Sequence, residues 1–87
     1  MMVEVVLDLP LKEIRRAAEQ VLGRPVTVSA DTEIARDLSV DSISLMNIVM
    51  ELEDRFDISI PLDRMADVQT AGQLADLIEE LRVGSNV

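Results

Sequence analysis

The chain has 87 residues, with 8 basic and 17 acidic side chains, a net charge of −9, one aromatic residue, no Cys and no His. This composition excludes disulfides and zinc sites built on Cys or His, and it argues against binding to nucleic acid or anionic membranes, which need basic patches. The length indicates one domain, and the absence of a long apolar run or a basic secretory leader predicts a cytoplasmic protein with no stable membrane insertion.

The first half of the chain predicts one helix and a long connection. Residues 1–9 form an N-terminal extension, which suits either a brief extended segment or a lead-in to a helix. Pro10 suits the first turn of a helix, so the first helix is predicted over residues 10–22. Its predicted apolar face consists of Leu11, Ile14, Ala18, Val21 and Leu22. Residues 23–41 form the connection, with at most one helical turn, beginning near Ile34.

The second half predicts two helices with a shorter one between them. The first of the two runs from Ser42 to about Arg55 or Phe56, and residues 62–67 form at most a short helix. Thr70 is the predicted N-cap of the last helix. The apolar stripe of that helix consists of Leu74, Leu77, Ile78 and Leu81. With a flexible tail at residues 83–87, the prediction is an all-α fold, a small four-helix bundle with a long first loop and a short third helix.

The helix that begins at Ser42 carries more apolar residues than one buried stripe requires. At about 100° per residue, one side of it forms a predicted core stripe: Leu45, Ile48, Val49, Leu52 and Phe56. Ile43, Met46 and Met50 gather on another side, bracketed by the acids Glu53 and Asp54. A helix buried on two sides is the alternative, but an apolar strip with a charged rim is typical of a protein-binding patch, and methionines suit several partners. We therefore favour a docking surface.

Ser42 lies at the N-terminal end of this helix. Most serines in such positions only cap the helix, since Asp41 or Ser42 can accept a backbone N–H bond in the first turn. The free N–H groups and the helix dipole also favour an anion there, so the hydroxyl is suited to carry a phosphodiester. Because the chain has no histidine to activate it, Ser42 is not an autonomous nucleophile, and a reaction at this residue requires another enzyme.

The segment "DLSVDSISLMNIVMELEDRFDISIP" combines a D-S-I motif, an aliphatic helix, an E-x-x-F ending and an I-P exit. In this combination and spacing it resembles the acyl carrier protein family, whose core is D-L-G-x-D-S-L followed by the same features. The matching positions are Asp37, Leu38, Asp41, Ser42, Ile48, Val49, Met50, Leu52, Glu53, Phe56, Asp57, Ile60 and Pro61. The ends of the first and last predicted helices also match, so the resemblance implies a carrier domain at residues 10–82.

The resemblance implies a carrier and not an enzyme. In that family a phosphopantetheinyl transferase attaches 4′-phosphopantetheine from coenzyme A to the serine of the motif, which implies Ser42 as the covalent attachment site and Asp41 as its motif neighbour. Acyl or aminoacyl groups are then carried as thioesters on the thiol of the cofactor. The resemblance also implies a docking site for acyl-loading, condensing or acyltransferase enzymes with basic faces, made of Ile43, Met46, Met50, Glu53 and Asp54.

Some positions depart from the family pattern. Ser39 replaces the usual Gly before the motif, and Ile43 replaces Leu. Ser44 and Asn47 stand where acids are frequent, and Arg55 adds a positive charge. The predicted docking helix is therefore less acidic than that of housekeeping fatty-acid carriers, and the last helix reads like those of polyketide or nonribosomal peptide carriers. These features are compatible with a role in lipid, polyketide or related secondary-metabolite biosynthesis.

The residues also bear on two other functions. A calcium loop starting at Asp31 fails, because the sixth position is Arg36 instead of Gly and the twelfth is Ser42 instead of Glu, so no metal site is expected. A small acidic helical adaptor without a prosthetic group shares the doubled helix face but has no need of Ser42. We expect a monomer that meets its partner enzymes transiently.

Overall fold

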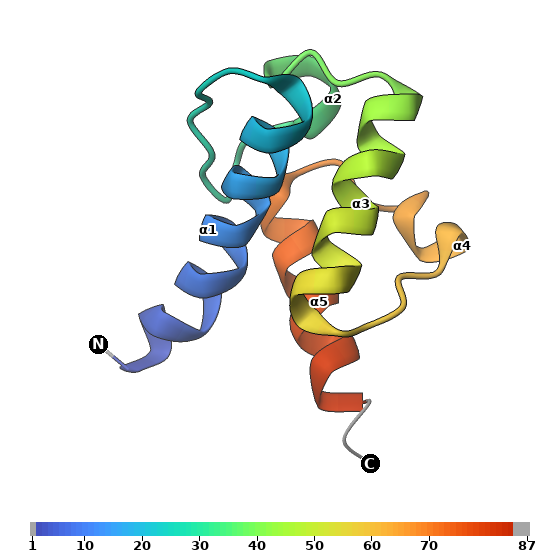
Figure 1. Cartoon of the computed structure of the whole chain (residues 1–87). Coiled ribbons are helices and arrows are strands. Elements are labelled where there is room, and N and C mark those ends of the chain that lie inside the picture. Colours follow the sequence, from blue (N-terminus) through green and yellow to red (C-terminus); the bar gives the residue numbers. More distant parts are fainter. Residues whose placement is uncertain (1, 85–87) are drawn as a thin grey trace.

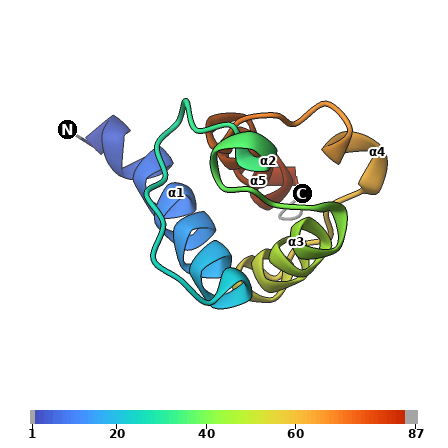
Figure 2. The same cartoon turned by 90° about the horizontal axis from the view of Figure 1, so that it is seen from above.

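A computed structural model describes residues 2–84, which form five helices. In chain order these are α1 (Met2–Leu22), α2 (Ile34–Asp37), α3 (Ser42–Phe56), α4 (Leu62–Met65) and α5 (Ala71–Gly84). The long helix α1 contacts both α3 and α5, and the short α4 lies on the side of the bundle away from α1 (Figures 1 and 2). The predicted all-α bundle with a long first loop is confirmed, and the helical turn expected in that loop is α2.

The helices at the two ends of the chain are longer than the sequence predicted. α1 begins at Met2, so the prediction that it starts at Pro10 is wrong, and of the two alternatives for the preceding residues the described part follows the helical lead-in. Proline is unfavourable inside a helix because it lacks an N–H group, but the Pro10 ring is fully buried in the bundle, and this packing offsets the loss. α5 continues through Gly84, and the rest of the predicted tail lies outside the described residues.

The core is aliphatic and lies between α1, α3 and α5. α3 contributes Ile48, Val49 and Leu52 as predicted, whereas Leu45 and Phe56 are only partly buried against it. The other long helices contribute Ile14, Ala17, Ala18, Ala71, Leu74, Ala75, Leu77 and Ile78. None of the described side chains in this core is polar or charged, so hydrophobic burial is its main stabilising term.

The long first loop is fastened to the start of α5 by backbone hydrogen bonds. The Ala71 N–H donates to the Thr32 carbonyl at 2.8 Å, and the Gly72 N–H donates to the Ala30 carbonyl at 2.9 Å. A Cβ atom on Gly72 would lie 2.8 Å from the Ala30 oxygen, so glycine allows the two backbones to approach this closely. The loop is therefore held against the bundle, although it contains only one turn of helix.

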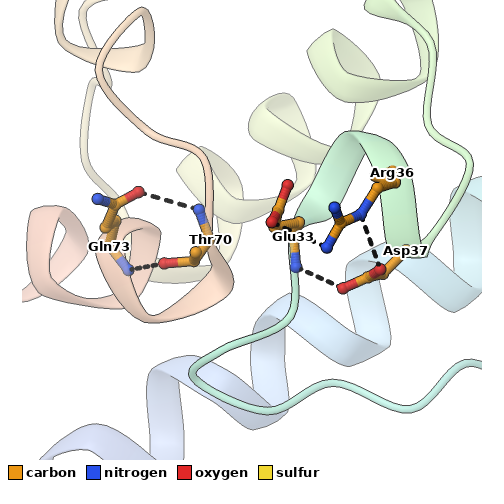
Figure 3. Close-up of polar contacts among 5 residues, drawn as sticks. All are labelled: Glu33, Arg36, Asp37, Thr70 and Gln73. Atoms are coloured by element: carbon orange, nitrogen blue, oxygen red, sulfur yellow. Dashed lines mark hydrogen bonds and ion pairs between the residues drawn. The ribbon is translucent and has the colours of Figure 1, made fainter.

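Short side-chain motifs order the two segments that meet there (Figure 3). At the start of α5, Thr70 Oγ1 accepts the Gln73 N–H at 3.1 Å and Gln73 Oε1 accepts the Thr70 N–H at 3.0 Å, which is a reciprocal capping box. This confirms Thr70 as the N-cap. Around α2, Asp37 Oδ2 accepts the Glu33 N–H at 2.8 Å, and Arg36 bridges to Glu33 at 2.9 Å.

Neither a membrane-spanning helix nor a metal cluster is found in the described chain. Across residues 2–84, no helix combines the length and the apolar character that a bilayer crossing requires. In the same residues, no three acidic side chains come together in a way that could hold a metal ion.

Candidate functional site

A short turn joins α2 to α3 and presents Ser42. Leu38 and Val40 anchor this turn, because both side chains are buried in the core. Ser39 lies exposed between them with a φ of 55°, in the left-handed region that glycine favours. The substitution of Ser for the usual Gly therefore falls on a position whose backbone does need that conformation. Arg24, just beyond α1, donates from Nη2 to the Leu38 carbonyl at 2.7 Å.

Asp41, and not Ser42, caps α3. Asp41 has an extended backbone, and its Oδ1 accepts the Ser44 N–H at 2.7 Å. This backbone hydrogen bond, with a side-chain bond from the same serine, holds the pKa of the Asp41 carboxyl below its usual value. Ser42 is the first helical residue and is exposed. Within residues 2–84 its hydroxyl has no hydrogen-bond partner, so the capping role does not occupy this oxygen.

The second apolar stripe of α3 is exposed. Ile43, Met46 and Met50 are 74%, 50% and 58% exposed, and Leu62 at the start of α4 is a further exposed apolar residue. Such large apolar side chains are costly to leave in water when they gather in one place. The alternative of a helix buried on both sides is therefore wrong. The stripe begins one residue after Ser42, which places an apolar surface directly beside the free hydroxyl.

A groove of about 250 Å³ runs between α3 and α4 along this stripe. Its lining residues are Leu45, Met46, Val49, Met50, Glu53, Ile60, Leu62 and Met65. Val49, Ile60 and Met65 are buried, whereas Met46, Met50 and Leu62 are exposed, so a partner that covers the stripe also covers the groove. The groove is shallow and almost entirely apolar apart from one carboxylate, and such a surface suits a protruding apolar side chain of a partner.

The charged residues near the end of α3 point in different directions. Glu53 is half-buried, and its Oε2 accepts the Ile60 N–H at 2.7 Å, so this carboxylate is engaged within the fold. Asp54 is exposed. Arg55 forms an ion pair of 3.1 Å with Glu13 of α1. The structure therefore brings Glu53 to the groove, leaves Asp54 in solvent and ties Arg55 to α1.

Sequence reasoning missed two residues at this site. Leu62 was not identified because a helix of four residues is too short to show an apolar periodicity, and the only signal was an apolar residue directly after Pro61. Arg24 was not identified because its contact with Leu38 spans fourteen positions of the chain. A long-range bond of this kind leaves no spacing pattern in the sequence.

Comparisons with known proteins identify relatives of this chain. A family profile described as a phosphopantetheine attachment site matches residues 12–78. The chain is 63% identical over 79 residues to a probable acyl carrier protein of Caulobacter vibrioides, and the alignment covers 91% of this chain and 92% of that protein. Among curated relatives it is also 35% identical over 71 residues to an acyl carrier protein of Sulfurovum, covering 82% of this chain and 92% of the relative.

The fold is also similar to solved structures. The solution structure of a holo acyl carrier protein from Geobacter metallireducens matches with a TM-score of 0.76 at 23% identity, covering 87% of this chain and 88% of that one. The profile spans well over half of the chain, and it includes α3 with Ser42 at its start. The chain therefore belongs to the acyl carrier protein family, whose members are non-catalytic carriers of 4′-phosphopantetheine.

Proposed function

We propose that Ser42 is the residue that receives 4′-phosphopantetheine. Its exposed hydroxyl at the start of α3 is the observation that carries the proposal, since Asp41 takes the capping role that would otherwise occupy this oxygen. The serine oxygen forms a new P–O bond to the pantetheine phosphate of coenzyme A, which releases adenosine 3′,5′-bisphosphate. The hydroxyl proton passes to a base of the phosphopantetheinyl transferase, because this chain has no histidine.

The start of α3 also suits the phosphodiester that results. α3 is 15 residues long, and the N–H groups of its first turn and its dipole favour an anion at this end. Asp41 directs its carboxylate to the Ser44 N–H. The acid adjacent to Ser42 in the chain is thus held in a hydrogen bond within the first turn.

We infer that the arm carries acyl or aminoacyl intermediates as thioesters in lipid, polyketide or related secondary-metabolite biosynthesis. One supporting likeness is the acetyl actinorhodin acyl carrier protein from Streptomyces coelicolor, which matches with a TM-score of 0.69 at 29% identity over 86% of this chain and 92% of that one. The departures at Ser44 and Asn47, which lower the acidity of α3, favour a specialised carrier over one for primary fatty-acid synthesis.

The exposed stripe of α3 is the proposed docking surface for the enzymes that load and unload the arm. Ile43, Met46 and Met50 supply its apolar centre, and Glu53 and Asp54 lie at its acidic end. A net charge of −9 favours partners with basic faces, because complementary charge speeds encounter. The partners are a phosphopantetheinyl transferase and acyl-loading, condensing or acyltransferase enzymes, which a monomeric carrier meets in the cytoplasm.

The test is an intact-mass measurement after incubation with coenzyme A and a broad-specificity phosphopantetheinyl transferase. Wild type and Ser44→Ala should each gain one arm, and Ser42→Ala should gain none. Ser44 is the matched control because it lies two positions away in the same helical turn. Modification of Ser42→Ala, or an unmodified wild type in a reaction that modifies an unrelated carrier, would favour the adaptor without a prosthetic group.

A further inference from the structure

We propose that Arg24 is a positioning residue that holds the turn before Ser42 in the conformation the transferase needs, an inference that rests on the proposed function of Ser42. Arg24 follows Gly23, the first residue after α1, and its Nη2 donates to the Leu38 carbonyl at 2.7 Å. This partly buried bond joins the end of α1 to the turn that leads into α3.

A hydrogen bond to the Leu38 carbonyl is well placed to restrain this turn. Its oxygen belongs to the peptide unit whose nitrogen is that of Ser39, so a bond that fixes the plane of this peptide also restrains φ of Ser39. That angle is 55°, which a residue with a Cβ adopts at a cost. The buried side chains of Leu38 and Val40 and the bond from the Val40 N–H to the Ala35 carbonyl hold the two ends of the turn. Arg24 adds a bond to the Leu38 carbonyl, which belongs to the peptide between them.

Loss of this restraint should lower the fraction of molecules that present Ser42 correctly. If the transferase binds only the competent conformation, its apparent KM for the carrier rises as that fraction falls, while kcat at saturation stays the same. For Arg24→Met we expect a higher KM than that of wild type, with about 5-fold as the upper limit that the loss of about 1 kcal/mol allows. Arg24→Lys, which keeps a donor on a shorter side chain, should give an intermediate KM.

The direction of the change in KM distinguishes a positioning role of Arg24 from an effect of its charge. Removing a cation from a chain with a net charge of −9 makes it more acidic, which should speed its encounter with a basic transferase and lower KM. Arg15, an exposed arginine of α1, is the matched control, because Arg15→Met makes the same change of charge without touching the turn. Arg24→Met should therefore raise KM, and Arg15→Met should leave it equal or lower.

A second substitution tests whether Arg24 acts through Ser39. Glycine populates the left-handed conformation without a Cβ penalty, so the turn of Ser39→Gly depends less on the bond from Arg24. The double variant Arg24→Met/Ser39→Gly should return KM to within about two-fold of wild type, whereas a purely electrostatic or global effect of Arg24 would not be relieved.

The experiment is steady-state kinetics of the transferase with the carrier as the varied substrate, beside amide hydrogen exchange at Val40. The Val40 N–H donates to the Ala35 carbonyl at 3.1 Å within the same turn, and its exchange should accelerate in Arg24→Met but not in Arg15→Met. A KM for Arg24→Met no higher than that of Arg15→Met, a raised KM that Ser39→Gly does not relieve, or unchanged exchange at Val40 would each overturn the inference. Failure to modify wild type would instead refute the proposed function, and the exchange measurement would still test the restraint.

Discussion

The two faces of α3 contain similar aliphatic side chains, yet one is buried and the other lies in solvent. Ile48 and Leu52 are buried in the core, and Leu52 is 0% exposed. Ile43, Met46 and Met50 are more than half accessible on average and line or adjoin a shallow groove. Apolar character alone therefore does not mark a core residue in so small a bundle. The buried face stabilises the bundle, and the exposed face provides an apolar surface beside Ser42.

The buried face should show the largest loss of stability on truncation. Leu52→Ala leaves a cavity among aliphatic neighbours and should lower the free energy of unfolding by about 2–5 kcal/mol, much of the stability of a domain of this size. Met50→Ala, on the exposed face, should change it by less than about 0.5 kcal/mol. Urea unfolding followed by circular dichroism measures both variants, and equal losses would remove the distinction between the faces.

Glu53 lies at the boundary between the two faces, and its removal should have an intermediate effect. Glu53→Met deprives the Ile60 N–H of its acceptor and should cost about 1–3 kcal/mol of stability, because an unpaired N–H next to a buried side chain is unfavourable. Glu53→Gln keeps an acceptor oxygen and should recover most of the loss. Thermal unfolding distinguishes the three proteins. If Glu53→Met is as stable as wild type but docks poorly, Glu53 belongs to the exposed face only.

Asp54 should show the smallest effect, and only in docking. It is exposed, so Asp54→Asn should leave stability unchanged and slow association with a basic partner about two-fold at low salt, in line with surface ion pairs worth about 0.2–1 kcal/mol. The difference should vanish at high salt, because salt screens exposed charges. Stopped-flow association rates at two ionic strengths provide the measurement, and a salt-independent loss would contradict an electrostatic role.

The features that depend on local spacing could be predicted from the sequence. The two stripes of α3 follow from a period of about 3.6 residues per turn, so their separation could be predicted before any contact was known. The capping role of Thr70 was predictable for the same reason, because it depends on residues within one turn of helix. The exposure of Ile43 followed once the core stripe was assigned to the opposite side.

The features that depend on packing could not be predicted in this way. Pro10 indicated a helix start by local rules, and the burial of its ring within the bundle overrides them. Ala17 and Ala75 are buried in the core, and a periodicity of large apolar residues does not reveal such small core residues. The bond from Arg24 to Leu38 requires the end of α1 to meet the turn before α3, and this follows only from the complete fold.

The most direct test of the difference between the two faces of α3 introduces aspartate at each of two methionines. Met46 is half exposed on the apolar stripe of α3, and Met65 is buried at the groove between α3 and α4. Met46→Asp should keep the circular dichroism spectrum and melting temperature of wild type while its rate of loading by a partner enzyme falls at least about tenfold, the effect of losing about 1.4 kcal/mol at an interface. Met65→Asp should destabilise the bundle by burying a charge. An unfolded Met46→Asp would show that its face is ordinary packing, and a folded Met46→Asp loaded at the normal rate by every partner would show that docking occurs elsewhere.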